Sequence, residues 1–444
     1  MNIYFISLGC DKNLVDSENM LGILHENGYR ITNSEQEADI IIVNTCCFIN
    51  DAKQESINTI LEMAEYKKSG SIKALIVTGC LAERYKEEIL SEIPEVDALL
   101  GTTSFHDILK AIDSITNGNK HVEFEDLDML PKSNSKRMLT SGTFSTYLKI
   151  AEGCDKHCTY CIIPQVRGNY RSVPMEDLIR EGEYLAEQGV KELILVAQET
   201  TLYGKDLYGD KSLNKLLKNL CAIDGIEWIR ILYCYPEEIT DELIEAMKEQ
   251  PKICRYLDLP IQHASDRILK LMGRRTSKQD LIDIITKLRT KLPDIVLRTT
   301  LITGFPTETE EEHKEVLEFV QQLQFDRLGV FTYSKEDQTP AAKLKPQVLA
   351  KVKKQRQKDI MKLQQSIVFE KTSKLVDNTY QVLIEGKIAD EENVYIGRTY
   401  MDAPQVDGFI FVRSQSELMS GEMVLAKVTG AKGYDLIGEL IIEE

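Results

Sequence analysis

The sequence predicts an α/β protein of three parts: an N-terminal parallel-sheet α/β domain, a central β/α barrel, full or partial, and a small C-terminal β-barrel. Strand-like and helix-like segments alternate over the first 125 residues and again through the middle of the chain. The last part instead holds short alternating strands, broken by glycines and acidic turns. Alternating strand–helix units build parallel sheets, whereas short alternating strands build closed barrels.

The N-terminal part, residues 1–125, repeats one pattern three times. Apolar runs at residues 3–9, 40–45 and 74–79 lead to Cys10, Cys46 and Cys80, and a helix-like stretch follows each cysteine. Ligand sites of parallel sheets form beyond the carboxyl ends of the strands, so three thiolates could converge there on one metal site. The alternative is three small buried residues, because free cysteine is often buried.

The central part follows a polar linker, which we place at residues 126–140. Residues 141–344 then contain at least six strand–helix units, and units of this length suggest a β/α barrel. The candidate strands are residues 147–151, 193–197, 228–233, 256–259, 295–300 and 327–331.

The C-terminal part begins with a long basic helix pattern at residues 345–374, which we interpret as a linking helix with solvated lysines. Residues 375–444 have the short strands of a small closed β-barrel. This segment contains five basic and thirteen acidic residues, a net charge of −8.

Composition and charge restrict the compartment and the partners. The chain of 444 residues has a formal net charge of −17, ten cysteines and no apolar run of membrane-spanning length. We also find no signal peptide and expect a cytoplasmic protein, in which clustered cysteines serve metal ligation or catalysis rather than disulfides. The acidic chain is repelled by a phosphate backbone but attracts a basic protein.

The most specific motif is Cys154-x3-Cys158-x2-Cys161, directly after the first predicted barrel strand. Three cysteines on one loop can hold three corners of a 4Fe–4S cluster, which leaves one iron open for catalysis. The alternative is a zinc site with His157 as fourth ligand, but this histidine lies between the cysteines rather than at the spacing of a zinc ligand.

This motif resembles that of the radical S-adenosylmethionine (SAM) superfamily, in which the open iron binds SAM and is used to generate a 5′-deoxyadenosyl radical. Tyr160 matches the aromatic position beside the adenine. The whole chain further resembles the methylthiotransferases, with a TRAM-like terminal β-barrel for substrate recognition. The resemblance implies SAM and two 4Fe–4S clusters as cofactors, the auxiliary one held by Cys10, Cys46 and Cys80. We interpret Cys47 as a packed thiol.

Three local sequences, at residues 7–18, 198–201 and 260–265, are similar to the RimO branch of this family. That resemblance implies transfer of a methylthio group to the β-carbon of an aspartate in small-subunit ribosomal protein twelve. It also implies an electron donor such as flavodoxin, and it leaves the sulfur source open. Two alternatives remain: the same reaction on a tRNA adenosine, which the acidic terminal barrel disfavours, and an iron–sulfur electron carrier or scaffold.

Further candidates for cofactor contacts lie where the central strands end. Gln198 and Glu199 could bind the amino group of SAM, and Arg298 could pair with its carboxylate or with a structural partner inside the barrel. Gly304 permits close backbone approach to a ligand, and Gln262 could contact ribose or substrate. We expect no acid–base pair, because hydrogen abstraction by a radical requires none.

Overall fold

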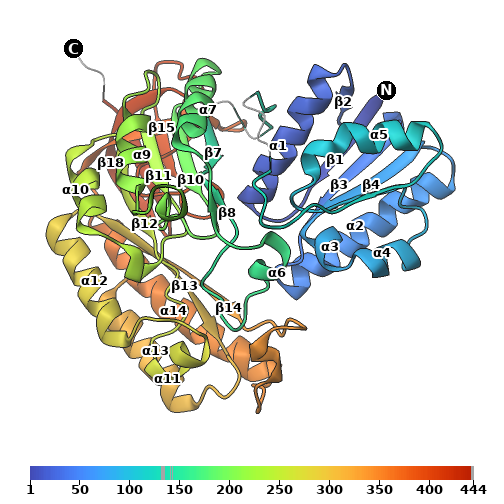
Figure 1. Ribbon diagram of the computed structural model, residues 1–444. Helices are drawn as coiled ribbons and strands as arrows, with labels where there is room; N and C mark the ends of the chain where they lie inside the picture. Colours follow the sequence, from blue (N-terminus) through green and yellow to red (C-terminus); the bar gives the residue numbers. More distant parts are fainter. Residues whose placement is uncertain (132–135, 141, 143, 442–444) are drawn as a thin grey trace.

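The computed structural model describes residues 1–131, 136–140, 142 and 144–441, and it confirms the predicted α/β class (Figure 1). Residues 132–135 of the predicted linker, 141 and 143 of the predicted barrel domain, and 442–444 of the terminal barrel lie outside the described residues. Figure 1 shows the N-terminal domain as a separate lobe beside the central domain, with the short helix α6 (Ile163–Arg167) between them.

The N-terminal domain contains a sheet of six parallel strands in the order β2-β1-β3-β4-β5-β6. Its strands are β1 (Asn2–Ser7), β2 (Arg30–Thr32), β3 (Ile40–Thr45), β4 (Ala74–Gly79), β5 (Ala98–Leu100) and β6 (His121–Glu123). Its helices are α1 (Asp11–Glu26), α2 (Asn50–Lys68), α3 (Cys80–Arg84), α4 (Lys86–Glu92) and α5 (Ile108–Thr116). Ile40 and Ile42 of β3 face one apolar core and Ile41 and Val43 the other, because successive strand residues point to opposite faces.

The central domain contains a second parallel sheet, in the order β14-β13-β12-β11-β10-β7. Its strands are β7 (Ser145–Lys149), β10 (Glu192–Val196), β11 (Trp228–Ile231), β12 (Ile253–Asp258), β13 (Val296–Thr303) and β14 (Arg327–Thr332). Within the described part of the chain no ladder joins β7 to β14, so the barrel is partial. Two short strands, β8 (Ala151–Glu152) and β9 (Arg171–Ser172), form a separate antiparallel pair.

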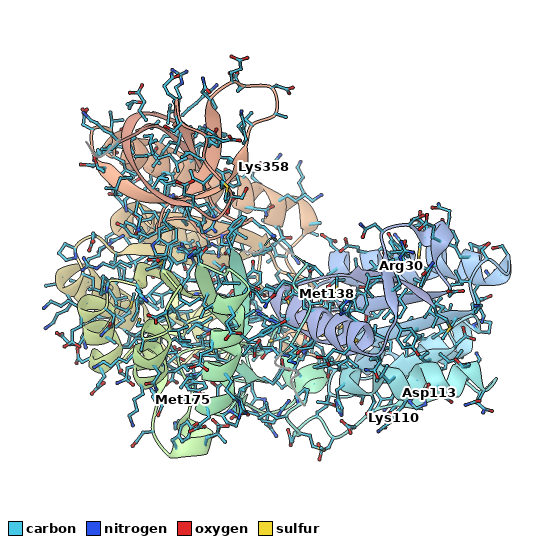
Figure 2. All side chains as sticks on the ribbon, turned by 90° about the horizontal axis from the view of Figure 1, so that it is seen from above. Arg30, Lys110, Asp113, Met138, Met175 and Lys358 are labelled. Atoms are coloured by element: carbon cyan, nitrogen blue, oxygen red, sulfur yellow. The ribbon has the colours of Figure 1, made fainter. Side chains whose placement is uncertain are left out.

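Helices cover the outer face of this sheet, where they enclose the largest apolar cluster of the chain. They are α7 (Met175–Glu187), α8 (Lys205–Tyr208), α9 (Leu213–Cys221), α10 (Asp241–Glu249), α11 (Asp266–Leu271), α12 (Lys278–Lys291) and α13 (Glu310–Leu323). The predicted linking helix is α14 (Ala350–Ser373). Ile360 and Ile367 of α14 are buried in the same cluster, whereas Lys358 is exposed (Figure 2).

The C-terminal barrel is closed in the order β15-β16-β17-β19-β18. Its strands are β15 (Thr379–Lys387), β16 (Val394–Arg398), β17 (Ile410–Arg413), β18 (Met423–Lys432) and β19 (Asp435–Leu440). Its apolar core is continuous with Ile194 and Val196 of β10, and Arg398 forms a buried ion pair with Glu192 at 2.6 Å. The barrel is therefore packed firmly against the central sheet. Among the described helices, none has both the length and the apolar character that crossing a membrane requires.

Candidate cluster and cofactor sites

The three N-terminal cysteines lie at one edge of the first sheet. Cys10 follows β1, Cys46 follows β3 and Cys80 follows β4, and these strands are neighbours in the sheet. Cys46 and Cys80 are buried and Cys10 is exposed. Burial, reinforced by the nearby Cys80 and Cys10 thiols, raises the pKa of Cys46 to about 12. The structure thus brings the three predicted ligands together, with one of them open to solvent.

Glycine is required immediately before two of these cysteines. Gly9 and Gly79 both have φ of +92°, in the left-handed region that disfavours other residues. A Cβ atom at Gly9 would lie 2.5 Å from Cys46 Cβ, and one at Gly79 would lie 2.3 Å from Asn44 Oδ1. These glycines therefore let the strand ends approach one another closely enough to gather the thiols.

The second cysteine set lies on the loop between β8 and α6. Cys154 and Cys158 are buried, and the Cys161 amide donates to the Cys158 carbonyl at 3.0 Å. The Ile163 amide donates to Cys161 Sγ at 3.4 Å, and the Tyr235 hydroxyl lies 3.6 Å from Cys158 Sγ. Donors of this kind stabilise thiolate ligands.

The spacing of potential ligand atoms bears on the alternative of a single zinc site. Thiolates at 2.3 Å from one zinc ion lie about 3.8 Å apart in a tetrahedral site. Among the described residues, only His106, Asp107 and Glu125 bring three potential ligand atoms within 4.8 Å of one another. Neither cysteine set forms such a group, and His157, the candidate fourth zinc ligand of the second set, is exposed. Three thiols without a fourth protein ligand are compatible with an iron–sulfur cluster.

Unpaired polar atoms surround the predicted binding site for the SAM amino group. Gln198 Oε1 and Glu199 Oε2, just beyond β10, are buried and make no hydrogen bond within the described protein. Burial raises the pKa of Glu199 to about 7, although the Thr201 hydroxyl, which donates to Glu199 Oε1, and Lys156 at 3.8 Å oppose this shift. Buried acceptors without a donor are costly, so a positively charged ligand group would fit here.

Two other candidates have protein partners of their own. Arg298 pairs with Asp258 at 3.2 Å and with Asp407 at 3.6 Å, which is the structural alternative for this residue. A Cβ at Gly304 would lie 2.3 Å from Lys353 Cγ, so the close approach here is that of helix α14. The contacts of both residues with SAM stay predictions.

The remaining candidates, Tyr160 and Gln262, lie at the same end of the central sheet. Tyr160 packs against the apolar cluster around Phe305, and Gln262 has φ of +71° in an isolated bridge with Leu301. Their contacts with SAM also stay predictions. The neighbouring His263 is a buried core residue whose Nδ1 accepts from the Ser265 amide at 3.0 Å.

One residue with clear functional contacts was missed. Arg167, at the end of α6, donates from Nε to Cys80 Sγ at 3.4 Å and from Nη1 to Asp16 at 2.8 Å and Glu152 at 3.1 Å. It thereby joins the N-terminal cysteine site to the central domain. No local pattern marks this arginine, because its partners come from distant segments.

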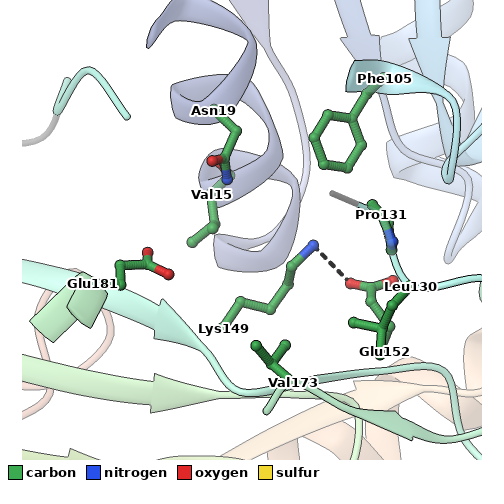
Figure 3. Close-up of a pocket in the computed structure, with 9 residues that line it drawn as sticks. All are labelled: Val15, Asn19, Phe105, Leu130, Pro131, Lys149, Glu152, Val173 and Glu181. Carbon is green, nitrogen blue, oxygen red and sulfur yellow. Dashed lines mark hydrogen bonds and ion pairs between the residues drawn. The ribbon is translucent and has the colours of Figure 1, made fainter. Parts of the chain in front are cut away.

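The seam between the two domains is closely packed and charged. Figure 3 shows Lys149 and Glu152, which form an ion pair at 2.8 Å, beside a cavity of about 20 Å³. Room for about one water molecule remains there. Nearby, the Met138 amide donates to the Glu18 carbonyl of α1 at 3.0 Å, at the junction visible in Figure 2. Lys149 and Arg167 of the central domain also pair with Asp16 of α1, so ion pairs cross the interface between the two domains.

Comparisons with known proteins agree over the whole chain. Three family models match in succession: Uncharacterized protein family UPF0004 at residues 2–101, the Radical SAM superfamily at 148–320 and the TRAM domain at 376–441. The chain is 65% identical over 438 residues to the ribosomal protein uS12 methylthiotransferase RimO of Lachnoclostridium phytofermentans, with 99% of both chains covered. It is 49% identical over 443 residues to the protein of the same name from Clostridioides difficile, covering 100% of this chain and 99% of that one.

The solved structures show similarity at the level of the fold. The radical S-adenosylmethionine methyltransferase TsrM from Kitasatospora setae, solved with cobalamin and a [4Fe-4S] cluster, superimposes with a TM-score of 0.57. The match covers 77% of this chain and 73% of that one, at 12% identity.

Proposed function

Because this chain belongs to the RimO family of ribosomal protein uS12 methylthiotransferases, we propose that it attaches a methylthio group to the β-carbon of an aspartate in uS12. The chain is a radical SAM enzyme, and its neighbours in fold include a radical SAM methyltransferase. The observation that carries the proposal is the pairing of two three-cysteine sites through α6. Ile162 and Val166, just after Cys161, are buried in the apolar core of the N-terminal domain.

Each cysteine set has its own role in this proposal. Cys10, Cys46 and Cys80 hold an auxiliary 4Fe–4S cluster that handles the sulfur, and Cys154, Cys158 and Cys161 hold the cluster that binds SAM. When bound, that cluster and SAM supply the radical that removes hydrogen from the substrate carbon.

The polypeptide's part is to hold SAM and exclude water. Gln198 and Glu199 orient the SAM amino group, because Gln198 Oε1 and Glu199 Oε2 are buried acceptors without a hydrogen bond among the described residues. Tyr160 would hold the adenine, and its packing against the apolar cluster that includes Phe305 keeps that side of the site apolar. Gln262 contacts the ribose, and Arg298 and Gly304 complete the proposed SAM site.

We also assign a task to each part of the chain. Residues 1–125 form the auxiliary-cluster domain, 126–140 the linker, 141–344 the radical domain, 345–374 the linking helix and 375–444 the substrate-recognition barrel. That barrel carries five basic and thirteen acidic residues, so it attracts a basic ribosomal protein and repels tRNA. A ribosomal substrate places the reaction in the cytoplasm, where a flavodoxin-like protein serves as the electron donor.

The test is an anaerobic reaction with a peptide of the uS12 target loop. The protein is loaded with iron and sulfide, reduced with dithionite and supplied with SAM. We expect a methylthio mass gain on the aspartate together with 5′-deoxyadenosine. Unmodified tRNA adenosine, incubated in parallel, is expected to stay unchanged.

Two results would contradict the proposal. Deoxyadenosine with modified tRNA and unmodified peptide would assign the enzyme to the tRNA substrate. Full iron loading without any deoxyadenosine would favour an electron carrier or scaffold.

A further inference from the structure

A buried lysine lies between the two cysteine sites. Lys12, on the first turn of α1, follows Cys10 by two residues, and its side chain is 8% exposed. Its ammonium group is 3.3 Å from the centroid of the Tyr233 ring and 3.0 Å from Asp11 Oδ1. The Tyr233 hydroxyl in turn donates to Asp11 Oδ1 at 3.1 Å. Lys12 of the N-terminal domain therefore contacts Tyr233 of the central domain.

Tyr233 belongs to the loops at the proposed SAM site. It follows β11 with φ of +59°, a strained conformation for a residue other than glycine. Its carbonyl accepts from the Thr200 amide at 3.0 Å, next to Gln198 and Glu199. Lys12 thus connects the first cysteine of one site with the loops of the other.

Three of the other cations around the two sites pair with protein carboxylates, whereas Arg274, near Cys158, contacts the Tyr235 ring at 4.2 Å. Arg167 binds Asp16 and Glu152, and Lys149 binds the same two carboxylates. Lys156 contacts Glu237 and Glu238. These cations are committed to protein carboxylates.

Lys12 differs from these cations in what its ammonium faces. An ammonium group has three N–H donors, and Asp11 is the one carboxylate that pairs with Lys12 among the described residues, beside its contacts with Tyr233 and Cys10. The Lys12 ammonium can therefore also donate to the carboxylate of a ligand.

We propose that Lys12 binds the side-chain carboxylate of the target aspartate and so holds its β-carbon between the two cysteine sites. This inference rests on the proposed function, in which the β-carbon must be reached from both sites. The face of the Tyr233 ring holds the Lys12 ammonium by a cation–π contact, which does not require a second protein carboxylate.

The test compares peptide binding, independent of turnover. Fluorescence anisotropy measures the affinity of labelled uS12 loop peptides that carry either aspartate or the isosteric asparagine at the target position, on anaerobically loaded protein. We expect wild type to prefer the aspartate peptide about tenfold or more, since a hydrogen bond to a charged group is worth that much. Lys12→Met should abolish this preference, and Lys12→Arg should keep part of it.

Controls separate binding from a structural role. Lys358→Met, at an exposed position of α14, should keep the full preference. A purely structural Lys12 would predict that Lys12→Met weakens both peptides equally and keeps their ratio, which would overturn the inference. If methionine lowers the iron content, Lys12→Gln provides a second uncharged variant.

The inference and the proposed function fail in different ways. If wild type modifies the aspartate peptide but shows no preference over asparagine, only the assignment of Lys12 is wrong. If fully loaded wild type does not modify the aspartate peptide at all, the proposed function itself is wrong.

Discussion

Arg167→Met tests how the two domains are held together. In wild type the Arg167 guanidinium contacts Asp16 at 2.8 Å and Glu152 at 3.1 Å, and the three side chains are 2–4% exposed. Removing one member of a buried ion network costs about 3–5 kcal/mol, because the opposite charges stay buried. Lys149 still pairs with both carboxylates, so we expect the lower end, about 3 kcal/mol.

Urea unfolding of the cluster-free protein measures this loss. Arg180→Met is the matched control, because Arg180 is 70% exposed and pairs with Asp177 on the surface of α7. It should change the free energy of unfolding by less than about 1 kcal/mol. If Arg167→Met is as stable as this control, the buried network does not stabilise the domain interface.

The same substitution should change the auxiliary cluster. Arg167 donates to Cys80 Sγ at 3.4 Å, and donors to cluster sulfurs raise the reduction potential by stabilising the more negative reduced state. Arg167→Met should therefore lower the potential of the N-terminal cluster, measured by a titration followed by electron paramagnetic resonance. An unchanged potential would show that this contact does not persist in the loaded protein.

Three other predictions concern single residues. Cys161→Ala should lower the iron content from about eight to about four per chain and abolish 5′-deoxyadenosine, as iron analysis and chromatography would measure. Glu199→Gln should weaken SAM binding about tenfold, and wild-type affinity should fall below pH 7, because protonating a carboxyl with a pKa of about 7 removes its charge; calorimetry measures both. Burial lowers the pKa of His263 to about 3, whereas the unfolded chain protonates near 6.5, so stability falls as pH drops. This term is about 1 kcal/mol between pH 7 and 5.5, and His263→Gln should remove it in urea unfolding.

The fold was largely predictable because its signals are local. Strand–helix alternation at a spacing of about 35 residues marks a parallel sheet wherever it occurs. Closure of the central barrel was not predictable, since it depends on whether β7 and β14 pair across the whole domain. The parallel pairing of β17 with β19 inside the terminal barrel is equally invisible to local patterns.

The site was predictable only where residue type alone carries the chemistry. Cysteines at strand ends and in a short loop stand out because cluster ligation needs thiolates. Arg167 and Lys12 do not stand out, because their partners Asp16 and Tyr233 belong to another domain. At Gly304 the sequence analysis expects the close approach of a ligand, whereas the structure shows the close approach of Lys353 from helix α14.

A single short helix connects the two cysteine sites. α6 has five residues and therefore spans about 7 Å. It begins two residues after Cys161 and ends at Arg167, whose Nε reaches Cys80 Sγ. Val166 is packed in the N-terminal core, and Thr102 donates to its carbonyl at 2.8 Å, so the helix cannot slide along its axis. A reaction that must reach one carbon atom from two sites requires such a fixed separation, because each ångström of misplacement is costly. The contacts between the two domains are therefore needed for the proposed reaction, as the cysteines are.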